Sequence, residues 1–335
     1  MGFRPKEEII AHTGGKVLIY GKTGTGKSTI LGTFPNINLV DSEDGNTFYL
    51  ENNPNIKGVL RTTSISEVQD TLDELDDEEL LNEFDTIGVD SGTKLYENMQ
   101  AAAYEIAESR ARRQIAKNKS VNMDDLNLSQ RDWGHIKRWN QRLKTAYISF
   151  SSMGKWVVEI AHEKDVFRDA TFDEKKKGID RVKIGEAPDL AKKAEYDFDI
   201  VLQTFTKEDK EGVKFYAKVI KDRTQVTKTG QILENPSFEI WREKWESTKK
   251  YGVKSALNLS QGVKKDKLKM EIENNNAEDI VSEIKTILKS ISETNQKKIG
   301  KFMKDKNVNL KDLVNNETDL LQEILDFAKL LTKEK

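Results

Sequence analysis

Gly21-Lys22-Thr23-Gly24-Thr25-Gly26-Lys27-Ser28 decides the fold of this chain, because it matches the full phosphate-loop pattern G-x-x-x-x-G-K-[ST]. An apolar segment at 16–20 precedes it and a helix-compatible segment follows it, as the motif requires. Its glycines let backbone N–H groups curl around phosphates, Lys27 supplies positive charge, and Ser28 supplies a hydroxyl for Mg²⁺. The stretch and Thr29 therefore predict an ATP site; the alternative is a glycine-rich turn without a ligand.

Length and composition bound the rest of the chain. A chain of 335 residues exceeds one average domain, so we expect two. It has no cysteine, and its three histidines are not spaced as metal ligands, which excludes disulfide frameworks and thiolate metal sites. No apolar run approaches the roughly 20 residues of a membrane span, so we expect a soluble cytoplasmic protein. The net charge of −2 means that nucleic-acid contacts must come from local basic patches.

Short apolar runs alternate with longer amphipathic ones, the pattern of a mainly parallel sheet with crossover helices. Residues 1–241 are therefore predicted to form an α/β core, with one helical stretch over 66–84. A shift toward Lys, Arg, Ser and Asn predicts a basic linker or arm over 242–270. Residues 271–335 have helical periodicity and predict a small helical bundle. The expected strands are 16–20, 37–40, 56–60, 86–90, 155–162, 198–205 and 213–220.

Two acids stand at the ends of predicted strands, where an open α/β sheet places its ligands. Asp90 ends the strand at 86–90 in the position of a Walker B acid, and with Ser28 it is predicted to hold Mg²⁺. The alternative for Asp90 is a helix cap. Glu43 follows the strand at 37–40 and is placed to polarise the water that attacks the γ-phosphate; an exposed acidic turn explains it equally well.

Together these residues resemble the RecA-like recombination ATPases, a family that includes RadA-type recombinases and DnaB-type hexameric helicases. The segment 40–43 looks like the one that carries the RecA catalytic glutamate, which points to Glu43. His162 ends a strand where the family has a γ-phosphate sensor, usually glutamine. Lys221 and Arg223 look like the family's Lys-x-Arg finger, which reaches a neighbouring subunit's nucleotide. A structural histidine and a solvated strand end are the respective alternatives.

The segments Asp132-Trp133-Gly134 and Ala161-His162-Glu163-Lys164 are similar to those of phage-encoded RecA-like annealing ATPases of the Sak group. The resemblance covers residues 14–240. It implies that the basic segment after the sensor strand contacts single-stranded DNA, although a hairpin with a solvated tip is an alternative. A second basic patch lies before residue 120. The DNA-binding candidates are Arg112, Arg113, Lys164, Arg168, Lys175, Lys176, Lys177 and Arg181.

We therefore expect a DNA-stimulated ATPase that works as a ring or filament on single-stranded DNA, in phage-type annealing or strand exchange inside the bacterial host. The C-terminal bundle is expected to bind a single-strand binding protein, another subunit or DNA. Two alternatives stay open. One is a nucleotide-gated DNA-binding or assembly module with little turnover, and the other is a DnaB-like helicase or loader.

Overall fold

The structure is a computed structural model that describes residues 5–45, 47–75, 78–117, 122–123, 126–178, 180–210, 212–253, 280–306, 308, 313 and 318–333. The chain divides into two compact units, Met1–Leu257 and Asn258–Lys335. Each unit is described by itself.

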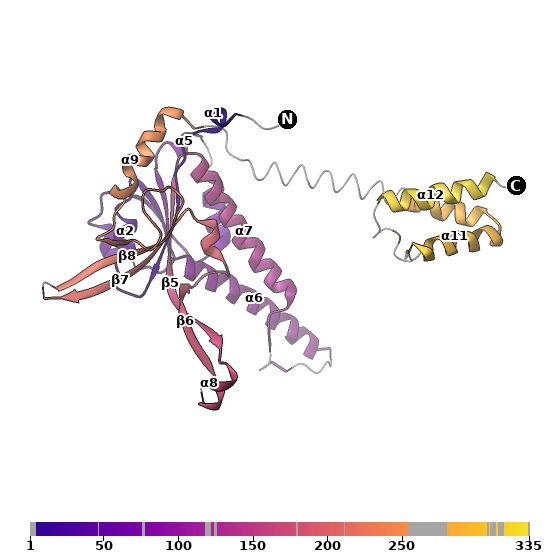
Figure 1. Ribbon diagram of the computed structural model, residues 1–335, viewed down its shortest axis with the longest axis horizontal. Coiled ribbons are helices and arrows are strands. Elements are labelled where there is room, and N and C mark those ends of the chain that lie inside the picture. Colours follow the sequence, from indigo (N-terminus) through magenta and orange to yellow (C-terminus); the bar gives the residue numbers. More distant parts are fainter. Residues whose placement is uncertain are drawn as a thin grey trace. The chain divides into compact units, whose positions relative to one another are not determined.

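One sheet, nine-stranded within the described residues, forms the centre of the first unit (Figure 1). Its order is β3-β2-β4-β5-β1-β7-β8-β9, and β6 pairs with β5 outside this path. Strands β1 to β5 and β7 run parallel, whereas β6, β8 and β9 are antiparallel to their neighbours. The predicted α/β fold with a mainly parallel sheet is thus confirmed. The strands are β1 Lys16–Gly21, β2 Ile37–Asp41, β3 Ile56–Arg61, β4 Thr86–Asp90, β5 Trp156–Asp169, β6 Arg181–Pro188, β7 Ile200–Asp209, β8 Gly212–Asp222 and β9 Ile232–Glu234.

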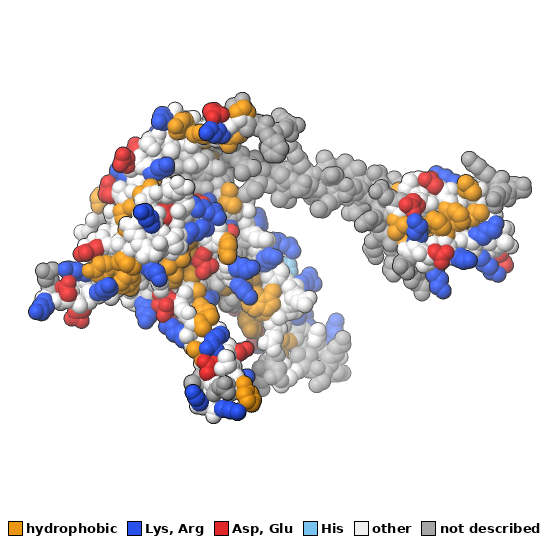
Figure 2. Space-filling model, in the orientation of Figure 1, with side chains coloured by type: hydrophobic (Ala, Val, Ile, Leu, Met, Phe, Trp, Pro, Cys, Tyr) orange, Lys and Arg blue, Asp and Glu red, His pale blue; other side chains and the backbone are white. Residues whose placement is uncertain are grey.

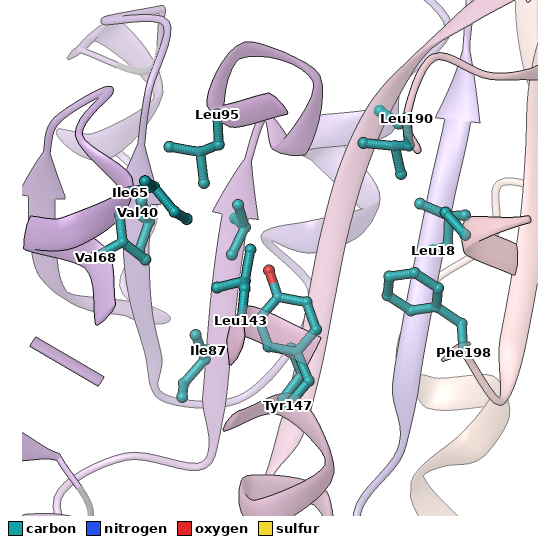
Figure 3. Packing of buried hydrophobic residues seen from close by; sticks show 14 of the residues in the cluster. Leu18, Val40, Ile65, Val68, Ile87, Leu95, Leu143, Tyr147, Leu190 and Phe198 are labelled. Carbon is teal, nitrogen blue, oxygen red and sulfur yellow. The ribbon is translucent and has the colours of Figure 1, made fainter. Parts of the chain in front are cut away.

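Helices cover both faces of the sheet. Alternate residues of a strand point to opposite faces, and β1 shows this directly. Leu18 packs in a cluster with residues of α4, α6 and α7 (Figure 3), whereas Ile19 packs in a second cluster with residues of α2 and α9. The helices of this unit are α1 Lys6–Ile9, α2 Lys27–Leu31, α3 Thr47–Leu50, α4 Ile65–Glu74, α5 Glu78–Leu81, α6 Gly92–Ile115, α7 Gln130–Ser152, α8 Phe172–Lys176 and α9 Glu239–Thr248, with 3₁₀ turns η1 Ala194–Asp197 and η2 Lys249–Tyr251.

The two long helices α6 and α7 pair through polar as well as apolar contacts. Ser129 caps α7 in a capping box with Asp132. Arg110 of α6 reaches the same Asp132 carboxylate at 2.5 and 2.6 Å. Farther along α7, the Lys144 ammonium pairs with Glu159 of β5 in the buried layer between helix and sheet. Both pairs hold α7 in one register against the elements it covers.

The predicted helix over 66–84 is wrong in its extent. Helix α4 ends at Glu74, and a separate short helix, α5, begins at Glu78. Acids at 73 and 74 oppose the negative C-terminal end of the α4 dipole, whereas acids at 78 and 79 favour the start of a helix. Charge therefore explains why one helix becomes two.

The predicted boundary between core and linker at 241/242 is also wrong, because it falls inside α9. Trp241 and Trp245 are buried in the second cluster of the first unit. The basic residues within 242–250 lie between and after these two buried tryptophans. Their basic composition therefore predicted a linker where the structure has a helix of the core. The rest of the predicted linker, 254–270, lies outside the described residues.

In the second unit, helical residues 280–290, α11 Glu293–Asp305 and α12 Thr318–Lys333 pack around a core of their own. Its buried members include Ile284, Ile299 and Ile324. Phe302 stacks on Phe327 with ring centroids 4.4 Å apart, which joins α11 to α12. The helical character predicted for this part of the chain is present.

Candidate nucleotide site

The phosphate loop joins β1 to α2 at the carboxyl edge of the sheet. Gly24 and Gly26 have φ angles of +75° and +86°, in the left-handed region that favours glycine. A Cβ on Gly26 would also lie 3.1 Å from the ring of Phe215 on β8. The side chain of Thr25 donates to the carbonyl of Lys22 at 2.8 Å. The loop is thus held in an open curve with its backbone N–H groups available to an anion.

Lys27 lies at the centre of this curve. Its ammonium donates to the carbonyls of Gly21 at 3.0 Å and Lys22 at 2.8 Å. Burial lowers the pKa of Lys27, while the charges of Asp90, Glu43 and Glu163 act in the opposite direction. The lysine therefore lies in the field of three acids that come from three different parts of the sheet's carboxyl edge.

Ser28 and Asp90, the predicted metal ligands, are in direct contact. The Ser28 hydroxyl donates to Asp90 Oδ2 at 2.8 Å. A hydroxyl beside a carboxylate at a phosphate loop is the kind of oxygen set that Mg²⁺ takes together with phosphate oxygens and water. The residues present therefore fit the ion. In the described ranges, this site included, no group of three or more His, Cys, Asp or Glu side chains is placed to hold a metal by itself.

Glu43 and His162 meet beside this pair. Glu43 follows β2, and His162 lies on β5 opposite Gly21 of β1. Glu43 Oε1 is 2.8 Å from His162 Nε2 and accepts a 2.5 Å hydrogen bond from Ser91 Oγ. The hydroxyl of Thr93 accepts from the backbone N–H of His162 at 3.0 Å. Two residues predicted from separate motifs are thus brought into one network.

Sequence reasoning missed several members of this network. Ser91 caps α6, and it also donates a hydrogen bond to Glu43. Thr204 of β7 shares a 2.7 Å hydrogen bond with Thr25. Glu163 accepts from Gln203 at 2.9 Å. Thr204 pairs with Gly21, and Glu163 follows the residue of β5 that pairs with Gly21. The signal that could have found both is their place level with the end of β1.

Lys221 and Arg223 lie at the opposite edge of the sheet from the loop. Asp222, between them, pairs with Ile200, which pairs with Val17 at the start of β1. The structure therefore does not bring these two cations to the nucleotide site of their own chain. Their predicted role on a neighbouring subunit's nucleotide stays a prediction.

Each of the two cations has partners at that edge. The Lys221 ammonium donates to the backbone carbonyls of Glu195, Tyr196 and Phe198. Burial lowers the pKa of Lys221, and the neighbouring Arg223 lowers it further. Arg223 is more exposed and lies 3.5 Å from Asp199. Of the two, Arg223 has the freer side chain.

The predicted DNA-binding residues after the sensor strand lie on a long hairpin that projects from the sheet (Figure 1). Strands β5 and β6 form its arms, and α8 lies near its tip. Arg168 is committed to Glu174, with two contacts of 2.8 Å, and Lys164 to Asp189 at 3.0 Å. Lys and Arg side chains gather on the exposed far end of the hairpin (Figure 2). These exposed residues are Lys175, Lys176, Lys177 and Arg181.

The second predicted patch lies on α6. Arg112 pairs with Glu108 one turn earlier at 3.5 Å, and Arg113 is exposed. Neither residue is near the phosphate loop in the chain's topology, because both belong to the C-terminal turns of a helix that begins at the loop's edge of the sheet.

Among the described residues, no helix is long and apolar enough to cross a membrane.

Comparison with known proteins adds a family. Residues 13–231 match the model of a protein family described as AAA domain. A search of the curated proteins found no match.

Among solved structures, the flagellar accessory protein FlaH from Methanocaldococcus jannaschii is similar at 13% identity, with a TM-score of 0.32, over 68% of this chain and 92% of that one. A KaiC-like protein from Pyrococcus horikoshii is similar at 13% identity, with a TM-score of 0.34, over 67% and 90%.

Proposed function

Because the chain belongs to the AAA domain family, we propose that it hydrolyses ATP at the phosphate loop and works as an oligomer on single-stranded DNA. The process that fits best is phage-type recombination, by annealing or strand exchange. The family match covers the loop, both predicted metal ligands and the Glu43–His162 pair. It supports the nucleotide chemistry, whereas the DNA and the oligomer are supported by the hairpin and by the placement of Arg223.

One observation carries the ATPase proposal, the convergence of Lys27, Asp90, Glu43 and His162 at one edge of the sheet. Lys27 and the loop amides bind the phosphates, and Ser28 with Asp90 would hold Mg²⁺. When bound, the ion neutralises charge that develops on the phosphate oxygens. Glu43 is a carboxylate beside the phosphate loop, suited to accept a proton from the attacking water.

His162 links this chemistry to the hairpin. It bonds Glu43 through its ring and lies on β5, the strand that continues into the projecting arm. If Glu43 changed its hydrogen-bond partners with the nucleotide state, the contact between Glu43 and the His162 ring would change as well. Strand β5 continues from His162 into the hairpin. This path supports coupling between nucleotide state and DNA binding.

The placement of Arg223 supports the oligomer. An arginine stabilises transition-state charge only where it reaches the phosphates, and in its own chain Arg223 lies at the far edge of the sheet. A neighbouring subunit in a ring or filament supplies a nucleotide for it. The second unit is proposed to bind a single-strand binding protein or a further subunit.

The test is ATP turnover by the full chain with and without single-stranded DNA, with Lys27→Ala as the blank. We expect DNA to stimulate turnover, and Glu43→Gln to lower kcat about a hundredfold or more while nucleotide binding persists. Assembly, followed by light scattering, is expected to survive Glu43→Gln. If wild-type turnover equals that of the blank while ATP still drives assembly, the protein is a nucleotide-gated module.

A further inference from the structure

A second cavity lies at the edge of the sheet opposite the phosphate loop. Its volume is about 390 Å³, within the range of small-molecule sites. Lys16 at the start of β1, Trp156 at the start of β5 and Asp199 just before β7 contribute from the sheet. Trp241 and Trp245 of α9 contribute from the covering helix. The nucleotide site at the carboxyl edge does not include this cavity.

Three indole rings line the cavity, and only one of them has an unused donor. Trp241 donates its N–H to Asp222 at 3.1 Å, and Trp245 donates to the carbonyl of Gly154 at 3.0 Å. The N–H of Trp156 is buried and has no hydrogen-bond partner among the described residues. Because the Trp156 N–H has almost no exposed surface, the cavity meets the rings of these tryptophans and not a free donor.

The charge of the lining is positive. Lys16, Arg223 and Lys244 stand against a single acid, Asp199. Lys16 bonds Asp199 with both its backbone N–H, at 3.1 Å, and its ammonium, at 2.7 Å. Arg223 lies 3.5 Å from the other oxygen of the same carboxylate. Among the described lining residues, Lys244 is therefore the cation without an acidic partner, and it is available to an anion.

The lining is also held in place before any ligand arrives. Asp222 accepts hydrogen bonds from Thr224, Thr227 and Trp241, and it anchors the turn that carries Arg223. Burial acts to raise the pKa of Asp222, but these hydrogen bonds outweigh it and keep the pKa below its usual value. A preformed lining reduces the ordering that binding would otherwise require.

We propose that this cavity is a ligand site for a small organic anion with a flat apolar body. The body lies against the indole rings, and the negative group meets Lys244. The site is separate from the nucleotide site of its own chain, and it shares Arg223 with the proposed contact between subunits.

The probe is anilinonaphthalene sulfonate, compared with the uncharged phenylnaphthylamine, each titrated into the full-length protein. We expect saturable binding of the sulfonate at one site per chain, and binding of the uncharged compound at least about threefold weaker.

Lys244→Met is expected to weaken the binding of the sulfonate and to leave the binding of the uncharged compound unchanged. Lys57→Met on the distant strand β3 is the matched control. Saturating Mg²⁺–ATP is expected to leave the sulfonate bound. Displacement of the sulfonate by ATP would overturn the proposal. So would equal affinity of both probes together with unchanged sulfonate binding in Lys244→Met.

Discussion

The carboxylate of Glu43 has two side-chain partners that come from different strands. Ser91 donates to it from the turn after β4, and the His162 ring approaches it from β5. A base that activates water needs a fixed direction as well as a suitable pKa, and two partners set that direction better than one. Ser91 is therefore a positioning residue.

Replacing Ser91 by Ala tests this role. Loss of a hydrogen bond to a charged group is worth about 1.5–3 kcal/mol, so kcat is expected to fall about tenfold or more at an unchanged nucleotide Kd. Because Ser91 also caps α6, the free energy of unfolding is expected to fall by about 1 kcal/mol. Steady-state turnover, nucleotide titration and denaturant unfolding measure the three quantities. Ser66→Ala, at an exposed serine of α4, is the control. Wild-type kcat in Ser91→Ala would contradict the positioning role.

Single residues also show where sequence reasoning reaches its limit. Lys27, Asp90 and Glu43 were found because each follows an apolar strand, and parallel strands bring such ends to one edge. The role of Ser91 depends on a contact across 48 positions, which no local pattern records. The carbonyl partners of Lys221 belong to the backbone and therefore leave no trace in side-chain patterns.

At the scale of elements, the β5–β6 hairpin combines fixed and free cations. Arg168 and Lys183 have acidic partners within the hairpin, whereas the cluster Lys175, Lys176 and Lys177 lies on its exposed end. Phe172 beside this cluster is 74% exposed. Sequence composition located the basic residues, but it did not separate those that stabilise the hairpin from those available to DNA.

Replacing Lys175, Lys176 and Lys177 with alanine is expected to weaken the binding of single-stranded DNA. The logarithm of the binding constant falls as the logarithm of the salt concentration rises, and each phosphate contact contributes about 0.7 to the steepness of that fall. The triple variant is therefore expected to have a slope that is about 2 shallower than that of the wild type. Fluorescence anisotropy over a salt series measures it. The matched control replaces three lysines of the β7–β8 hairpin with alanine, namely Lys207, Lys214 and Lys218. Equal slopes for wild type and the 175–177 variant would exclude this tip from the DNA site.

The pairing of α6 with α7 predicts a pH dependence. Hydrogen bonds from Ser129 and Arg110 lower the pKa of Asp132 from 3.8 to about 2. The folded pKa lies below the unfolded one, so this stabilisation is fully present above pH 3.8 and is lost as the pH falls toward about 2. Asp132→Asn is expected to be less stable than wild type at neutral pH, and the difference is expected to shrink below pH 3.8. Urea unfolding at several pH values measures it, and a difference that stays constant with pH would contradict this assignment.

At the scale of the whole molecule, two units with separate cores predict separate unfolding steps. All five tryptophans lie in residues 1–257, so tryptophan fluorescence reports the first unit alone, while circular dichroism reports the helices of both. A ligand that binds only the folded state stabilises it by about 2.7 kcal/mol at a hundred times its Kd. Mg²⁺–ATP is therefore expected to raise the midpoint of the fluorescence transition. It is expected to leave unchanged the midpoint of the second unit's transition, which circular dichroism follows. Lys27→Ala is expected to abolish the shift without moving the midpoint of the second unit. A single transition that both probes follow, and that ATP shifts as a whole, would show that the two cores unfold as one.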